Sequence, residues 1–428
     1  MIETVTNFFE TKLNGPMQKL AQQRHLQAVR DGIIATLPLI IVGSFFLIVA
    51  MPPIPQDWEI YQFLNGNAGT ILLPYRMTMF IMTVYATFGI GHSLAKSYKL
   101  DALTGGILAT IAFLCTITPV MVAEPTPEGV AGWVMPMGNL GGGGLFVSII
   151  VSILAVEAYR LTSKSKFKIT MPEQVPPAVA KSFEALTPTI VVIVGMATIT
   201  YFLGFNWHTF VSDLISPVVS AADSLPSVLL LIFLITGFWS FGIHGVSIIG
   251  SLARPLWLQL LETNTTALAN GSAPTAIAAE PFFQWFVWIG GSGCTIGLAI
   301  LLAFKTKSKV ASSMGKTAFL PAVFNINEPL IFGTPIVLNP ILIIPFILTP
   351  MVCAIIAWIA TSMELVDKVV VTAPWTLPGP IGAYLATGGD WRSIVLSLIL
   401  IVLSVVIYYP FVKMYDNNLL KEEQGEVE

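Results

Sequence analysis

The chain has 428 residues, of which 55% are hydrophobic and 11% charged, and its formal net charge is −3. A typical soluble domain carries about 25% charged residues, so this composition excludes a water-facing surface over most of the chain. Domains that bind nucleic acid present basic patches, and a net charge of −3 therefore excludes nucleic acid as a partner. The three cysteines stand far apart in apolar stretches, and neither a disulfide framework nor a metal site is predicted.

Charged residues separate long uncharged stretches, and these stretches are the predicted membrane spans. A spanning helix needs about 20 mostly apolar residues, which gives this chain material for about ten spans and no further soluble catalytic domain. The predicted fold is therefore an all-α polytopic membrane protein. In chain order the stretches are 32–56, 77–95, 102–123, 129–156, 185–212, 224–253, 281–304, 329–363, 369–389 and 393–412.

The distribution of Lys and Arg predicts the orientation of these spans. Seventeen of the 21 fall on segments assigned to one side, three on segments assigned to the other, and Arg254 is unassigned. Cytoplasmic loops carry the excess of Lys and Arg. The chain is thus predicted to be a multi-pass protein of a bacterial plasma (inner) membrane with both termini cytoplasmic.

Three stretches of the second half contain breaks that are unlike full helices. Parity calls for an even number of crossings between residues 225 and 262, which a hairpin that turns at Gly242-Ile243-His244-Gly245 satisfies. Segments 319–333 and 374–389 are short and rich in Pro and Gly. Irregular backbone at membrane depth is tolerated only where protein or a water-filled cavity satisfies it. We therefore expect re-entrant hairpins and a binding site in the second half, and a scaffold in the first five spans.

An amphipathic linker is predicted between the two halves. Residues 172–186 are polar, with apolar residues at Val175, Val179, Phe183 and Leu186, as in a helix that lies along the membrane interface. The predicted organisation is a scaffold over 1–171 (helices 1–4), the linker 172–186, a fifth scaffold helix at 187–205, a transport domain at 206–413 and a cytoplasmic tail at 414–428.

Glu328 and His244 are the strongest candidates for a functional site. Glu328 is the one charged residue between Lys316 and Glu364, and a carboxylate buried at membrane depth costs several kcal/mol unless it is partnered or protonated. His244 stands between two glycines within a 30-residue uncharged run. The alternatives are a carboxylate that faces cytoplasmic water and a histidine bonded to a backbone carbonyl at a hairpin tip.

Weaker candidates surround these two residues or lie in irregular loops. Trp375 follows a proline on a non-helical segment, where its ring offers either a face to a sugar or an interfacial anchor. Four others are polar or glycine positions beside the two main candidates, and one lies in an irregular polar loop of the first half: Asn325, Asn327, Gly242 and Gly245, with Asn139.

Taken together, the segments 241–245 (FGIHG) and 325–333 (NINEPLIFG), the Pro374-Trp375 loop and the midpoint linker resemble a known family. The chain is similar to EIIC permeases of the bacterial phosphoenolpyruvate-dependent phosphotransferase system, lactose/cellobiose family, near the diacetylchitobiose branch. The resemblance implies a homodimer formed by the first five helices and a sugar site in the second half. His244 and Glu328 would bind a β-linked disaccharide near the hydroxyl to be phosphorylated.

The resemblance also implies partners. Phosphate would come from a phosphocysteine on a separate EIIB subunit, which is supplied through EIIA and HPr, so this chain would be the membrane subunit of a sugar phosphotransferase complex and bind no cofactor itself. An ion-coupled secondary transporter, which also uses broken helices, and a channel are the alternative functions. Coupling ions usually call for several intramembrane carboxylates, whereas only Glu328 and Glu157 qualify here. The residues leave open which disaccharide is carried and whether Glu328 is a base or only a ligand.

Overall fold

A computed structural model describes residues 22–52, 54, 57–126, 129–166, 169, 171–172, 174–334, 336–337 and 339–424. Within these ranges the chain is helical apart from loops and one β-hairpin, so the all-α fold class is confirmed. The basic residues Lys12, Lys19 and Lys168, on which the predicted orientation partly rests, lie outside the described residues, as do the first 21 residues and the last four of the tail.

The membrane character of the chain is confirmed, but not the number of spans. Six helical segments of the described chain are long and apolar enough to cross a membrane, and a seventh is obtained if a pair bent by 79° counts as one span. They are Arg24–Ala50, Ala68–Ser97, Gly142–Ser163, Ser182–Phe202, Pro340–Ser362 and Trp391–Glu423, with the bent pair Trp207–Ala222 and Leu225–Ser240. The other predicted stretches contain shorter or interrupted helices.

Packing divides the described chain into two compact units. Unit 1 comprises residues 44–72 and 219–424, and unit 2 comprises 22–43 and 73–218. Helix α4 (Leu37–Ala50) contributes to both. Residues 44–72 therefore group with the C-terminal part of the chain, which the sequence did not indicate, while the roles assigned to the predicted domains stay predictions.

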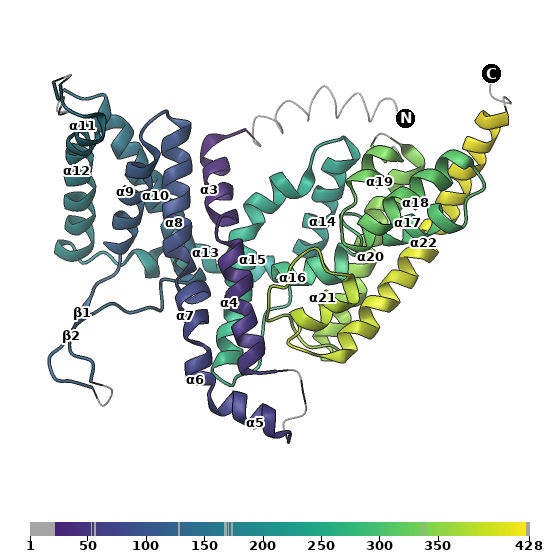
Figure 1. The fold of residues 1–428 in the computed structure, drawn as a ribbon, viewed down its shortest axis with the longest axis horizontal. Helices are drawn as coiled ribbons and strands as arrows, with labels where there is room; N and C mark the ends of the chain where they lie inside the picture. Colours follow the sequence, from purple (N-terminus) through teal and green to yellow (C-terminus); the bar gives the residue numbers. More distant parts are fainter. Residues whose placement is uncertain are drawn as a thin grey trace. The chain divides into compact units, whose positions relative to one another are not determined.

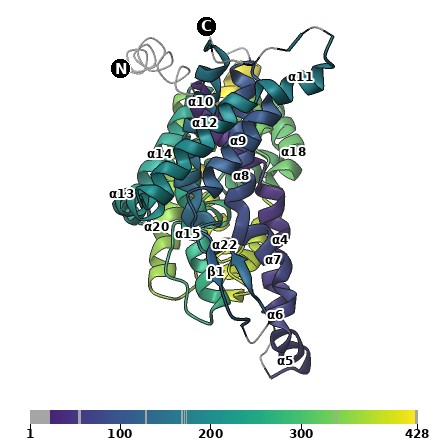
Figure 2. The same ribbon diagram turned by 90° about the vertical axis from the view of Figure 1, so that its left-hand side faces the viewer.

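Unit 2 consists of helices that pack closely through small residues. Helices α8, α9 and α10 run side by side, as both views show (Figures 1 and 2). A Cβ on Gly91 of α8 would lie 2.5 Å from the carbonyl oxygen of Gly105 in α9, so the two backbones are in contact. Such small-residue contacts let membrane helices pack closely. The elements of unit 2 are α3 (Arg24–Ile34), α7 (Leu73–Thr78), η2 (Met79–Ile81), α8 (Met82–Ser97), α9 (Ala102–Leu114), β1 (Val120–Val122), β2 (Gly132–Val134), η3 (Gly142–Gly144), α10 (Leu145–Ser163), α11 (Pro177–Glu184), α12 (Leu186–Ala197), η4 (Thr198–Phe202) and most of α13 (Trp207–Ala222).

Two predicted spans of unit 2 are shorter than expected. The stretch 102–123 is helical only as far as Leu114, and the stretch 129–156 only from Gly142. Between them β1 and β2 form an antiparallel pair, with Val120 opposite Val134. Part of the apolar region 115–141 therefore forms a β-hairpin. A count of uncharged residues cannot distinguish such a hairpin from a helix.

The predicted amphipathic linker is partly helical. Helix α11 covers eight residues, Pro177–Glu184, and α12 begins two residues later at Leu186. The expected helix over 172–186 was thus too long. Phe183 and Leu186 are both exposed. Exposure is expected for apolar residues that face the membrane interface.

Unit 1 alternates long helices with short broken ones. Helices α17, α18, α19, α20 and α22 gather in one region of Figure 1. The elements are α5 (Glu59–Gly66), α6 (Ala68–Ile71), α14 (Leu225–Ser240), α15 (Gly245–Ala269), α16 (Glu280–Phe282), η5 (Phe283–Val287), α17 (Ile296–Phe304), α18 (Lys309–Val323), α19 (Glu328–Gly333), α20 (Pro340–Ser362), α21 (Gly379–Ala386) and α22 (Trp391–Gln424).

The start of α18 is held by carboxylates from the far end of α22. Asp416 accepts hydrogen bonds from the backbone N–H groups of Lys307 (2.9 Å) and Ser308 (2.9 Å). Glu423 accepts from the Ser308 hydroxyl (2.7 Å) and from the Val310 N–H (3.2 Å). The first N–H groups of a helix have no partner within it. Residues of α22 supply those partners for the helix that leads to Glu328.

Candidate functional site

The turn between α14 and α15 depends on two glycines. Helix α14 ends at Ser240 and α15 begins at Gly245, which confirms the predicted break. Gly242 has a φ of +75°, where residues with a Cβ are strained. A Cβ on Gly245 would lie 2.0 Å from the carbonyl oxygen of Ile235. Both glycines are therefore required by the backbone of this turn, whatever else they contact.

His244 caps α15 and has a defined tautomer when neutral. Its Nδ1 accepts a hydrogen bond from the Ser247 N–H at 3.1 Å. The proton of the neutral ring is thereby assigned to Nε2, which is left as a donor. The side chain is exposed, yet Trp239 packs against it with 4.3 Å between ring centroids. The Glu328 carboxylate lies near enough to His244 to interact with it electrostatically.

Glu328 lies at the start of α19, close to His244, and it is exposed. The expectation of a buried carboxylate is wrong, because this six-residue helix buries Leu330 and Ile331 and turns Glu328 away from them. Phe332 of the same helix lies 6.2 Å from Trp239, centroid to centroid, and Trp239 also contacts His244. Trp239 thus contacts both His244 and the helix that begins with Glu328.

Asn325 fastens two loops to the turn before α19. Its φ is +61°, a conformation that Asn tolerates better than most residues. The side-chain oxygen accepts from the Gly290 N–H (2.8 Å), and the amide donates to the carbonyls of Trp375 (2.9 Å) and Leu377 (3.0 Å). All of these contacts are to backbone, and the side chain is buried. Its predicted contact with sugar stays a prediction.

Asn327 holds one of the same loops from the other side. Its amide donates to the Ser292 carbonyl at 2.7 Å and to the Thr295 hydroxyl at 3.2 Å. We call the segments 288–295, 324–327 and 374–378 the tied loops, since Asn325 and Asn327 join them. Three irregular segments are thereby fixed to one another within unit 1, through contacts between residues up to 52 positions apart in the chain.

The segment 288–295 is a feature that sequence reasoning missed. The stretch 281–304 was expected to be one continuous span, but α17 begins only at Ile296. Gly290, Gly291 and Gly293 have φ values of +81°, +98° and +88°, so the chain turns where a helix was predicted. The run Gly290-Gly291-Ser292-Gly293 was the available signal.

The remaining candidates are placed differently. Trp375 lies in the tied loop 374–378 with 52% of its surface exposed, so its ring is free to meet a ligand. Asn139 belongs to unit 2, where it is exposed in the loop before η3. Unit 1 therefore holds seven of the eight predicted site residues: His244, Glu328, Asn325, Asn327, Trp375, Gly242 and Gly245.

Comparison with known proteins points to one family. Residues 30–350 match the family model described as "Phosphotransferase system, EIIC". The lichenan permease IIC component of Bacillus subtilis (strain 168) is 40% identical over 98% of this chain and 95% of its own length. The cellobiose-specific EIIC component of Geobacillus stearothermophilus is also 40% identical, over 95% of this chain and 93% of that protein.

A solved structure and a longer relative extend this likeness. The crystal structure of the transporter ChbC, the IIC component from the N,N′-diacetylchitobiose-specific phosphotransferase system, superposes with a TM-score of 0.91 at 35% identity. It covers 98% of this chain and 100% of that one. The lactose-specific EIICB component of Staphylococcus haemolyticus (strain JCSC1435) is 32% identical over 96% of this chain, which spans 70% of that protein.

Proposed function

Because this chain belongs to the EIIC family of phosphotransferase systems, we propose that His244 and Glu328 hold the sugar hydroxyl that receives phosphate. The chain is a permease component for cellobiose-, chitobiose- or lactose-type sugars. The observation that carries the proposal is that Trp239 contacts both His244 and Phe332 of α19, the helix that begins with Glu328, within one unit. Within this proposal the sugar is a β-linked disaccharide.

The two residues suit complementary roles in the transfer. The sugar hydroxyl oxygen attacks phosphorus, the bond between phosphorus and the EIIB cysteine sulfur breaks, and the sulfur leaves as thiolate. Phosphoryl transfer depends chiefly on holding these atoms in line, with a group placed to accept the hydroxyl proton. The exposed Glu328 carboxylate accepts that proton, and the Nε2–H of His244 donates to a sugar or phosphate oxygen.

The phosphocysteine belongs to a separate EIIB subunit in this proposal. The lactose-specific relatives are named EIICB and extend beyond the region that this chain matches, which supports EIIB as the partner. Cys115, Cys294 and Cys353 are all buried and so are unsuited to exchange phosphate with another protein. EIIA and HPr act through EIIB. A homodimer and cytoplasmic termini complete the proposal.

The ion-coupled alternative has no specific support in the described chain. Glu157, the second carboxylate considered for coupling, is engaged by Arg160 at 3.0 Å and by His25 at 3.2 Å, and it also accepts a hydrogen bond from Tyr98. A carboxylate that is held by two basic side chains is less available to bind and release an ion.

The test compares Glu328→Gln with His244→Ala in membrane vesicles that contain saturating phosphorylated EIIB. We expect Glu328→Gln to keep sugar affinity within a few-fold but to lower the phosphorylation rate by about 100-fold or more, the usual contribution of a general base. His244→Ala should lower both. Glu59→Gln, an exposed carboxylate on α5, is the control. A normal rate in Glu328→Gln would show that Glu328 only binds sugar.

A further inference from the structure

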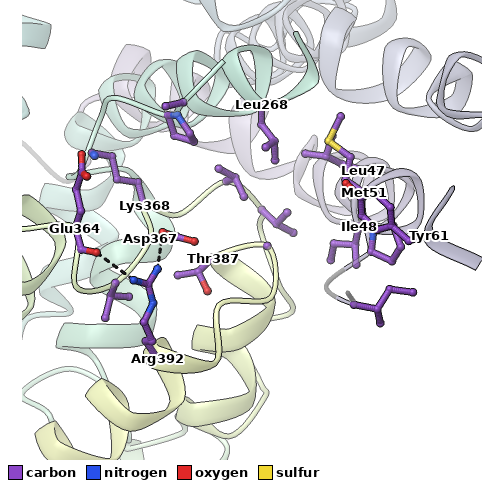
Figure 3. Close-up of a pocket in the computed structure, with 18 residues that line it drawn as sticks. Leu47, Ile48, Met51, Tyr61, Leu268, Glu364, Asp367, Lys368, Thr387 and Arg392 are labelled. Carbon is purple, nitrogen blue, oxygen red and sulfur yellow. Dashed lines mark hydrogen bonds and ion pairs between the residues drawn. The ribbon is translucent and has the colours of Figure 1, made fainter. Parts of the chain in front are cut away.

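Unit 1 contains a pocket that shares no residue with the His244 and Glu328 site. Its volume is about 640 Å³, within the range of ligand pockets. One wall is polar and the other largely apolar, and the two face each other across the space (Figure 3). We define the polar wall as Glu364, Asp367, Lys368, Thr387 and Arg392, and the apolar wall as Leu47, Ile48, Met51 and Tyr61.

The polar wall is fixed before any ligand arrives. The Arg392 guanidinium donates to the Asp390 carboxylate (2.8 Å), to Asp367 (2.8 Å) and to the carbonyl of Glu364 (3.2 Å). Asp390, only 3% of whose side chain is exposed, also accepts from the backbone N–H of Asp367. The segment 364–368 is therefore preorganised, which reduces the entropy lost on binding. The Asp367 carboxylate remains 61% exposed and retains acceptor capacity.

The charges of the pocket favour a neutral polar ligand. Its lining contains two acidic residues, Glu364 and Asp367, and two basic residues, Lys368 and Arg392, so the formal charges cancel. An anion or a cation would meet an equal number of like charges. A sugar has a rim of hydroxyls that suits charged hydrogen-bond partners and a face of C–H groups that suits the apolar wall and the Tyr61 ring.

The position of the pocket along the chain places it on the outer side of the membrane. Only three Lys or Arg residues fall on the predicted outer segments, namely Arg76, Lys368 and Arg392, and two of them line this pocket. Segments 51–73 and 262–280 contain no Lys or Arg and are assigned to the outer side by the same count, and they contribute Tyr61 and Leu268 to the lining of the pocket. By the same count, Lys305, Lys307, Lys309 and Lys316, just before and within α18, lie on the cytoplasmic side.

From these observations we infer that the pocket is an outer capture site, which binds the disaccharide before it reaches His244 and Glu328. The inference rests on the proposed function for its orientation and its sugar. Binding here concentrates sugar at the outer face, whereas the phosphoryl transfer takes place at the other site. Loss of the capture site should therefore raise KM and leave kcat unchanged.

The direct test is protection of an introduced cysteine from an impermeant maleimide in intact cells. Ile48→Cys places a thiol on the apolar wall and leaves the polar wall intact, and the three native cysteines are buried. The sugar is whichever of cellobiose, diacetylchitobiose and lactose the wild type phosphorylates. In a His244→Ala background, we expect that sugar to slow labelling at position 48 at least threefold. The exposed Glu59→Cys, outside the pocket, should be labelled at an unchanged rate.

A second measurement uses the native site residues. Tyr61→Ala should raise the KM for sugar phosphorylation about fivefold with kcat retained. Tyr409→Ala is the control, because Tyr409 is exposed on α22 and does not line the pocket. An unchanged KM in Tyr61→Ala, or labelling at position 48 that sugar does not slow, overturns the capture site alone. Labelling of neither cysteine from outside overturns the proposed orientation, and a wild type that phosphorylates none of the three sugars overturns the proposed substrate class.

Discussion

Glycines have opposite roles in the two units, since they allow close helix packing in unit 2 and occupy breaks between helices in unit 1. In unit 2, Gly91 and Gly105 lie inside helices and let α8 and α9 touch without interrupting either one. In unit 1, Gly290 and Gly291 lie where helical structure stops, with φ values of +81° and +98°. The first use satisfies every backbone group within its own helix, while the second frees groups that need other partners. A membrane unit built from broken helices therefore needs polar side chains that hydrogen-bond to its free backbone groups. In unit 1, Asn325 and Asn327 fill that role.

The largest effect is expected from Gly291→Ala. A Cβ at this position would lie 2.3 Å from Cγ of Asn327, and the φ of +98° is unfavourable for alanine. We expect a loss of stability of about 2 kcal/mol or more together with loss of sugar binding. Melting temperature and calorimetric affinity in detergent measure both. Gly195→Ala in α12, where a Cβ would meet nothing within 4 Å, is the matched control and should be tolerated.

Asn325→Asp removes the hydrogen-bond donors of this side chain without changing its size. The amide donors to the carbonyls of Trp375 and Leu377 are lost, and a carboxylate is set against those carbonyls. Each buried group left without a partner costs about 1–3 kcal/mol. Affinity and melting temperature should fall together. Asn206→Asp is the control, because the Asn206 side chain only accepts, from the Thr209 N–H at 3.0 Å, and Asp accepts equally well. Equal behaviour of the two variants would contradict the fastening role.

Gly91→Ala tests the other half of the comparison. Its Cβ would lie 2.4 Å from the Cβ of Ala109 and force α8 away from α9. Overpacking of this kind costs about 1–3 kcal/mol. Since unit 2 contains neither His244 nor Glu328, sugar affinity should hold while the melting temperature falls. An affinity loss as large as that of Gly291→Ala would mean that the two units do not differ in this way.

Trp375→Ala has the smallest expected effect. The ring is half exposed on a tied loop, and loss of one stacking face is worth about 1 kcal/mol, or about fivefold in affinity. The fold should survive, because the contribution of residue 375 to the ties is its backbone carbonyl. Trp133→Ala on β2 removes a tryptophan that is 74% exposed and serves as the control. Unchanged affinity by calorimetry would make Trp375 a membrane anchor.

Sequence reasoning found what composition and local chemistry encode. Lack of charge revealed the membrane class, and Gly242 and Gly245 revealed the break at His244, since both act within a few residues of chain. The structure confirms both, and it brings His244 close to Glu328 as the shared motif resemblance implied.

What the sequence did not reveal depends on contacts between distant segments. Glu328 looked buried because its neighbours in the chain are apolar, but the burial of Leu330 and Ile331 decides which way it faces. Asn325 was predicted as a sugar ligand from its place in an irregular segment, and that position gave no sign of its structural partners, which lie 35 and 50 residues away. The pocket lined by Tyr61 and Arg392 could not be predicted from the sequence, because no local pattern joins segments so far apart in the chain.

The hydrogen bonds between α22 and the start of α18 can form only after α22 has been synthesised. The N–H groups of Lys307 and Ser308 find their acceptor in Asp416, which is made 109 and 108 residues later. Glu423, the acceptor for the Ser308 hydroxyl, follows after 115 residues. While the ribosome is still adding α20 to α22, the residues just before α18, the helix that leads to Asn325 and Glu328, lack these acceptors. The proposed sugar site is therefore completed late, after its own residues have been synthesised, and unit 2 can already be packed by then.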